Sequence, residues 1–247
     1  MQSQDNNMTL LMTPIKYLND DKYVEAFDLV THILQEKANL TSFTDNEWQV
    51  IGDIYLTIGK FSEAANAYLL AQNICGEALA LILDGKISEA KLKLKDETPS
   101  PARNWCYFLS EVLLNSLFIT HWPSHLQIRH FMENTVYYLL VAKKDVYINK
   151  IFGKLDKLLQ INQDSEKYIG YAYFHYGELD KSLDLLINSA KRNQYDGEIY
   201  FVLGQLYYAK HEYWDALSML ENAALFLPEH YPTKMLKEKI LQKIKSV

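Results

Sequence analysis

Apolar residues recur along much of the chain at the spacing of an amphipathic helix. Trp48, Ile51, Gly52 and Tyr55 fall at positions i, i+3, i+4 and i+7. This spacing places all four on one face of a helix. Few segments show the strict alternation of apolar and polar residues that is typical of a half-buried strand. The pattern therefore predicts an all-α protein.

The same phrase returns twice near the C-terminal end of the chain, in copies that are 34 residues apart. The front copy continues with Ala64, Tyr68 and Ala71; the second copy has Ile169, Gly170, Tyr173, Ser182, Leu186 and Ala190; the third has Tyr200, Leu203, Gly204, Tyr207, Ala216, Leu220, Ala223 and Pro228. A glycine inside a helix costs roughly 1 kcal/mol relative to alanine. Its return in one slot, at Gly52, Gly170 and Gly204, therefore predicts a close approach of two helices at that slot.

This phrase resembles the tetratricopeptide repeat (TPR), a helix–turn–helix unit of 34 residues. The resemblance implies an all-α fold, namely an α-solenoid of antiparallel helix pairs that forms a TPR-like right-handed superhelix in a single domain, 1–247. The clear repeats are 45–78, 163–196 and 197–230, and the degenerate repeats are 7–40, 79–100 and 129–162. An amphipathic segment, 233–245, follows Pro228 and Pro232. It is predicted to be the solvated capping helix that a solenoid needs at its end.

The repeat pattern is interrupted at residues 96–101, where Pro99 and Pro101 flank a serine. Two prolines so close together stop a helix and let the chain turn. The segment that follows, 104–120, is apolar around much of its circumference and is predicted to be one long central helix. Such a helix is usually buried on two sides. The alternative is an exposed dimer interface.

Composition and charge narrow the class of protein. With 247 residues, 49% of them hydrophobic, the chain is large enough to bury a core and does not belong to the disordered class. The net charge of -6 argues against nucleic-acid binding. The lysine-rich tail, 234–245, suits a helix C-terminus, with contact to an acidic partner as the alternative. No segment has the pattern of a signal peptide or a membrane span, so cytoplasmic residence and no membrane insertion are expected.

Residues that could carry chemistry are poorly arranged for it. His121, His125 and His130 are close in sequence, but Pro123 and a spacing of five residues keep them off one helical face, so no metal site is expected. Cys75 and Cys106 are interpreted as small buried residues rather than a disulfide. Cys106 has no neighbouring histidine in sequence to activate it. No phosphate-binding glycine loop is present in the sequence. The chain is therefore predicted to be no enzyme and to need no cofactor.

The resemblance implies a functional surface on the concave side, which the first helices of the repeats line. Residues one step beyond the packing stripe are rotated by about 100° and should face this groove. They are Gln49, Asp53 and Leu56 in the front repeat, Lys167, Tyr171 and Phe174 in the second clear repeat, and Phe201, Gln205 and Tyr208 in the third. Some family members hold a C-terminal carboxylate with lysine, arginine and asparagine in such slots. Here the slots hold aromatic residues and one lysine.

An aromatic groove suits an apolar peptide segment or a partner helix. The predicted function is a non-catalytic scaffold for protein–protein interaction, in which Tyr171, Phe174, Phe201 and Tyr208 form one partly exposed apolar patch. The alternative for these rings is that they pack on neighbouring helices. The alternative functions are a self-associating structural subunit, as a homo-oligomer, and a regulatory or targeting subunit that recruits a separate enzyme such as a transferase.

Overall fold

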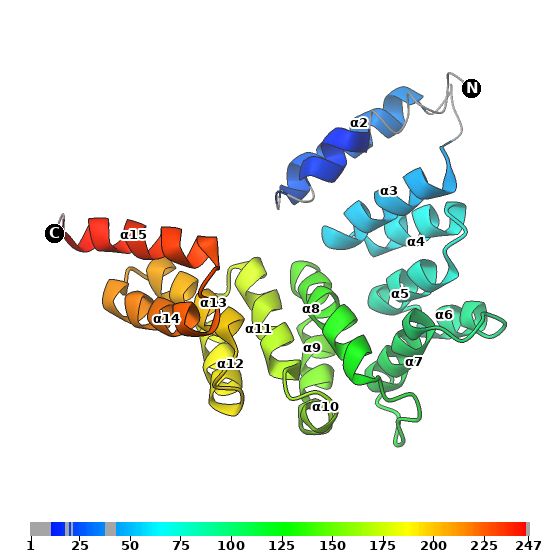
Figure 1. The fold of residues 1–247 in the computed structure, drawn as a ribbon. Coiled ribbons are helices and arrows are strands. Elements are labelled where there is room, and N and C mark those ends of the chain that lie inside the picture. Colours follow the sequence, from blue (N-terminus) through cyan, green and yellow to red (C-terminus); the bar gives the residue numbers. More distant parts are fainter. Residues whose placement is uncertain (1–10, 18–19, 21, 38–42, 246–247) are drawn as a thin grey trace. The chain divides into compact units, whose positions relative to one another are not determined.

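The computed structural model describes residues 11–17, 20, 22–37 and 43–245, and within these ranges the regular secondary structure is helical throughout (Figure 1). This confirms the predicted all-α fold class. Two compact units can be distinguished within the chain, for which a single domain was predicted. Unit 1 is Met1–Pro123 with Tyr138–Gly153, and unit 2 is Ser124–Tyr137 with Lys154–Val247. The boundary crosses α8 (His125–Val141), so this one helix contributes to both units.

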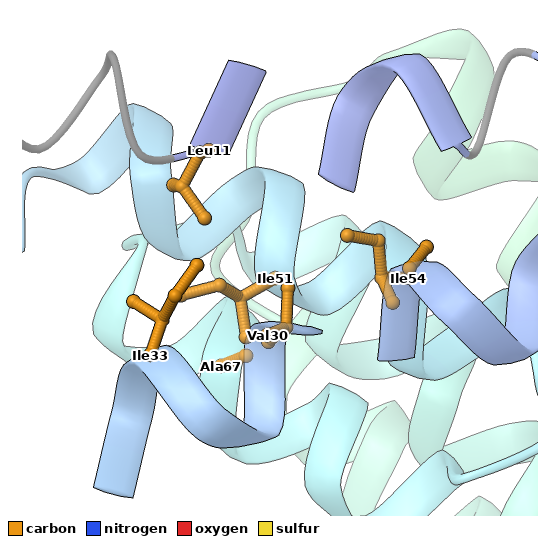
Figure 2. Packing of buried hydrophobic residues seen from close by; sticks show 7 residues of the cluster. Leu11, Val30, Ile33, Ile51, Ile54 and Ala67 are labelled. Atoms are coloured by element: carbon orange, nitrogen blue, oxygen red, sulfur yellow. The ribbon is translucent and has the colours of Figure 1, made fainter. Parts of the chain in front are cut away.

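Unit 1 is a succession of helices in which α2 to α7 each pack on the next. Its helices are residues 11–17, α2 (Tyr23–Lys37), α3 (Asp45–Thr57), α4 (Phe61–Leu70), α5 (Ile74–Asp84), α6 (Ile87–Leu94), α7 (Pro101–Leu113), the end of α8 and α9 (Asp145–Phe152). Buried side chains from residues 11–17, α2, α3 and α4 point toward one another in Figure 2, where Leu11, Val30, Ile33, Ile51 and Ala67 are labelled. Of the predicted repeat 7–40, residues 7–10, 18–19, 21 and 38–40 lie outside the described residues.

Local caps set where the helices of unit 1 begin and end. Thr44 and Glu47 form a capping box at the start of α3, which satisfies backbone N–H groups that the first helical turn leaves unpaired. The side chain of Asn73 accepts a hydrogen bond from the backbone N–H of Gly76, so α5 begins at Ile74. The expected boundary between repeats 45–78 and 79–100 therefore falls inside α5. Gly85, with φ of +96°, ends that helix.

The expected long helix 104–120 is wrong at both ends. The helix starts earlier because Ser100 caps it and Pro101 occupies its first turn. It ends at Leu113, and Asn115 follows with φ of +54°. The chain then turns back, because the backbone N–H groups of Thr120 and His121 bond to the side chain of Glu111. Residues 114–120 are thus a connection and not the end of a helix.

Unit 2 holds two of the clear repeats. Its helices are the first part of α8, α10 (Leu155–Ile161), α11 (Ser165–Tyr176), α12 (Leu179–Arg192), α13 (Gly197–Ala209), α14 (Tyr213–Phe226) and α15 (Tyr231–Lys245). α11 packs on α12, and α13 packs on α14, as antiparallel pairs. The buried Ile240 of α15 joins Ala216 and Leu220 of α14 in one cluster, so the predicted terminal helix packs on the last pair.

Candidate interaction surface

Each repeated glycine lies against a large side chain of the second helix of its pair. A Cβ atom added to Gly52 would be 2.7 Å from Cε1 of Tyr68. The corresponding Cβ would be 2.8 Å from Leu186 Cδ2 at Gly170 and 2.7 Å from Leu220 Cδ2 at Gly204. These distances are too short for any real side chain, so the predicted close approach and the helical register are confirmed. The register in turn fixes the positions one step beyond the stripe.

In unit 1 the predicted groove residues bond to their own unit. The hydroxyl of Tyr68 donates to Asp53 Oδ1 at 2.7 Å, and Gln49 Nε2 donates to the same oxygen at 3.0 Å. Asn73 Nδ2 donates to Gln49 Oε1 at 2.6 Å. Leu56 is buried, with 3% of its surface exposed. It is therefore a core residue and does not face an open groove as expected.

Burial raises the pKa of the Asp53 carboxyl, although the hydrogen bonds from Tyr68 and Gln49 act in the opposite direction. Burial also raises the pKa of Tyr68, with further contributions from the nearby carboxylate, so the phenol stays a neutral donor. Asn73 is a member of this network that sequence reasoning missed. The signal was present in the sequence, since Asn73 precedes Gly76 by three residues as a helix cap does, but the start of α5 was placed too late.

In unit 2 the single predicted lysine is neutralised within the fold. Lys167 is buried, and its Nζ lies 2.7 Å from Asp196 Oδ2 and 2.9 Å from Glu198 Oε2. Burial lowers the pKa of Lys167, but the bonds to the two carboxylates outweigh burial and leave the pKa raised. The same Nζ lies 5.5 Å from the centre of the Tyr171 ring. Lys167 ties the start of α11 to the start of α13 and is not free to hold a carboxylate from a partner.

The predicted aromatic residues of unit 2 are all half-buried. Tyr171 and Phe174 pack on the cluster that includes Leu186 and Leu203. Phe201 and Tyr208 pack on the cluster of Ala216, Leu220 and Ile240. Each ring therefore has one edge in the core and one edge that solvent reaches. That the accessible edges form one continuous patch stays a prediction.

Neighbouring groups hold these aromatic side chains in place. The ring centre of Phe201 lies 4.7 Å from that of His230. The ring of Tyr208 contacts the ring of Tyr213, and Nζ of Lys239 lies 5.0 Å from the centre of the Tyr208 ring. The hydroxyl of Tyr171 is buried and has no hydrogen-bond partner among the described residues. The Tyr171 hydroxyl is therefore not accessible to a partner. Gln205 is half-buried beside these rings on α13.

The remaining candidate chemistry is dispersed. His121 Nδ1 lies 2.8 Å from Glu111 Oε1, whereas His125 and His130 are exposed. Among the described residues, no three histidine, cysteine or acidic side chains are placed to hold a metal ion. Both cysteines are free thiols, and burial raises the pKa of Cys106. Within the same part of the chain, no helix is long and apolar enough to cross a membrane.

No family model and no curated protein matches this chain. Two solved structures resemble it in fold. The APC/C hetero-tetramer Cut9–Hcn1 matches with a TM-score of 0.38 and 15% identity, over 95% of this chain and 42% of that one. The TPR domain of P58(IPK) matches with a TM-score of 0.36 and 14% identity, over 97% of this chain and 66% of that one. The chain thus spans less than two thirds of each, and likenesses this weak carry no argument about partners.

The pairs α3–α4, α11–α12 and α13–α14 each consist of two helices joined by a short turn, with the repeated glycine at their contact. These three helix pairs resemble the tetratricopeptide repeat. This confirms the resemblance at the level of the single repeat. The first helices of two successive TPR-like pairs, α11 and α13, carry the predicted residues Lys167, Tyr171, Phe174, Phe201, Gln205 and Tyr208. These residues are together called the first-helix face of unit 2.

Proposed function

We propose that this chain is a non-catalytic scaffold that binds another protein through the first-helix face of unit 2. The observation that supports this function is the set of half-buried aromatic side chains that α11 and α13 place there. Aromatic rings with one edge in the core and one edge exposed are rigid, and they offer a large contact area at a low entropic cost. Such rings are typical of the residues that dominate the binding energy of protein interfaces.

The charge distribution supports an apolar partner segment. Asp196 and Glu198 neutralise Lys167, so this face lacks the free lysine that a clamp for a C-terminal carboxylate would use. The proposed ligand is an apolar or aromatic peptide segment or a partner helix, which would lie across Phe174, Phe201 and Tyr208. In unit 1, Asp53 accepts hydrogen bonds from Gln49 and Tyr68, and Gln49 accepts one from Asn73, so the proposed role of that face is to hold the fold. Cytoplasmic residence and the absence of nucleic-acid binding are part of this proposal.

A clean test adds bulk and charge to the face without removing core packing. Replacing Tyr171 and Phe201 together by serine is unsuitable, because both rings also pack on buried clusters. Gln205→Arg places a long cation on α13 between the rings. Ser218→Arg, at an exposed position of α14, is the matched control. A partner is first identified by affinity capture, and its affinity for the purified variants is then measured by calorimetry.

We expect Gln205→Arg to weaken binding about 10-fold or more, since an unpaired charge in an apolar contact is costly, and Ser218→Arg to leave the affinity unchanged. Equal affinities for both variants, at unchanged melting temperatures, would rule out this face as the binding surface. If capture returns only copies of this chain, and sedimentation shows a mass that depends on concentration, the chain is a self-associating subunit. If the captured protein is an enzyme whose activity the chain changes, the targeting or regulatory function is the better description.

A further inference from the structure

The connection between α7 and α8, residues 114–124, has an apolar tip. Leu117 is 94% exposed, Phe118 is 83% exposed and Leu114 is 51% exposed. Residues 114–119 include no charged side chain. In Figure 1 this connection extends beyond the end of α7. Two adjacent large apolar side chains with almost their whole surface in solvent are unusual and mark an interaction site more often than scattered exposed residues do.

A buried carboxylate fixes the base of this connection. Glu111, near the end of α7, accepts hydrogen bonds from the backbone N–H groups of Thr120 at 2.9 Å and His121 at 3.0 Å. Its Oε1 also lies 2.5 Å from the Thr120 hydroxyl and 2.8 Å from His121 Nδ1. Burial raises the pKa of Glu111, but these hydrogen bonds outweigh burial and lower it to about 2. The carboxylate is therefore charged and fully engaged at neutral pH.

Aromatic contacts fix the returning segment of the connection to α7. The His121 ring stacks on Tyr107, with ring centres 4.7 Å apart, and Trp122 lies 5.8 Å from Phe108. At the other end, Lys150 of α9 donates to the carbonyl of Leu113. Both ends of the connection are anchored within unit 1, and only the tip is left without packing. Fixing both ends restricts where the tip can move, which reduces the entropy that binding must remove.

We propose that Leu117 and Phe118 form a protruding anchor that inserts into an apolar pocket on a protein partner. The area of the tip argues against a second copy of this chain as the occupant. Even a large aromatic side chain buries about 150–250 Å², so two such side chains from each copy would bury at most about 1,000 Å² in total. A stable interface needs about 1,200 Å² or more. A concave pocket on a different protein can enclose both side chains and add its own surroundings to the contact.

The charge of the tip argues against a membrane surface as the occupant. Binding to anionic lipid headgroups depends on clustered lysine or arginine side chains, and residues 114–119 include neither. An uncharged apolar tip is matched best by an uncharged apolar pocket, as for the central anchors of other protein interfaces. This surface lies in unit 1, so the inference does not depend on the function proposed for the first-helix face of unit 2.

The test places a photo-crosslinking amino acid, p-benzoylphenylalanine, at position 118 of the full chain. A second variant of the chain carries the same amino acid at position 92, in place of the exposed Leu92 of α6, which lies in the same unit. Both are irradiated in an extract of the source cells, and the crosslinked residues are identified by mass spectrometry. The captured protein is then purified. Its affinity is compared for the wild type, the double variant Leu117→Ser/Phe118→Ser and the control Leu92→Ser.

We expect one protein to be crosslinked from position 118 and not from position 92, through apolar residues of its surface. The double variant should bind this protein about 30-fold or more weakly, as the loss of a central anchor implies. Leu92→Ser should bind it normally, and all melting temperatures should be equal. If the Gln205→Arg variant weakens this binding and the double variant does not, the tip is not an anchor, while the function proposed for unit 2 stands.

Other outcomes would overturn the proposal. Crosslinks found only between copies of this chain would identify the tip as a self-association contact. Co-sedimentation of the wild type, but not the double variant, with vesicles of phosphatidylcholine and phosphatidylserine would identify a lipid surface instead. The absence of a crosslink specific to position 118, or a marked fall in the melting temperature of the double variant, would show that the tip has no separate binding role.

Discussion

The pair α3–α4 of unit 1 and the pair α13–α14 of unit 2 share the same glycine slot but use it differently. Opposite Gly52 lies the ring of Tyr68, and opposite Gly204 lies the side chain of Leu220. Tyr68 carries a hydroxyl that reaches Asp53 on the neighbouring helix, whereas leucine has no polar group to offer. The same close approach therefore supports a polar network in one pair and a purely apolar contact in the other.

The difference shows that the residue facing the glycine influences the first-helix face. In unit 1 Tyr68 engages Asp53, and Asp53 in turn engages Gln49, so the polar side chains of α3 are used within the unit. In unit 2 the positions on α13 that correspond to Gln49 and Asp53 hold Phe201 and Gln205, and both are half-buried. A glycine in the first turn of α5 extends the contrast. A Cβ atom on Gly76 would be 2.8 Å from Tyr68 Cδ1, so Tyr68 fills the space beside two glycines.

The largest expected effect is therefore at Tyr68. Tyr68→Ala should lower the free energy of unfolding by about 3–5 kcal/mol, because it leaves a cavity next to α3 and α5 and removes a donor from a half-buried carboxylate. Leu69→Ala, at the exposed neighbouring position, should change it by less than about 0.5 kcal/mol. Urea denaturation monitored by circular dichroism measures both. A loss at Tyr68 no greater than at Leu69 would show that the ring is not a common packing element of α3 and α5.

A smaller effect is expected when the glycine slot of unit 2 is filled. Gly204→Leu should destabilise the protein by about 1–3 kcal/mol through overpacking against Leu220, which is fully buried and cannot easily move aside. Ala209→Leu, an exposed position on the same helix, serves as the control for added volume. Equal melting temperatures for the two variants would mean that α13 and α14 can move apart at little cost. The close contact at Gly204 would then not be needed for stability.

The sequence was sufficient for the helix pairs because their signals are local. Glycine, tyrosine and alanine at helical spacing specify the contact between two helices that are close in sequence, and the structure has Gly52, Gly170 and Gly204 in such contacts. The end of α7 was not predictable in this way. Residues 114–120 are apolar enough for a helix, and the chain turns there because Glu111 bonds to groups nine and ten residues away.

The face residues show the same limit. A helical stripe predicts the direction of a side chain from its own helix, but not what the next helix lays over it. Leu56 and Lys167 were predicted on the same basis as Gln205, yet the first two are buried and Gln205 is half-buried. For Lys167 the reason is electrostatic, since Asp196 and Glu198 at the start of α13 hold its charge. Pairing between residues that are 29 and 31 positions apart leaves no periodic trace in the sequence.

The smallest expected effect is the pH dependence of stability that Asp53 contributes in unit 1. The contact between Gly204 and Leu220 in unit 2 is apolar and contributes no such dependence. Burial raises the pKa of Asp53 above its ordinary value of 3.8 in the folded protein. Between 3.8 and this raised value the folded protein binds a proton that the unfolded chain does not, so stability rises as the pH falls through this window. Asp53→Asn cannot bind this proton. The wild type should therefore gain stability relative to Asp53→Asn as the pH falls toward 3.8, as measured by urea denaturation at a series of pH values.

Asp96→Asn, at an exposed position, controls for the loss of a carboxylate elsewhere in unit 1. The opposite result, in which the wild type loses stability in acid relative to Asp53→Asn, would contradict this prediction. It would mean that the hydrogen bonds from Tyr68 and Gln49 lower the pKa of Asp53 by more than burial raises it.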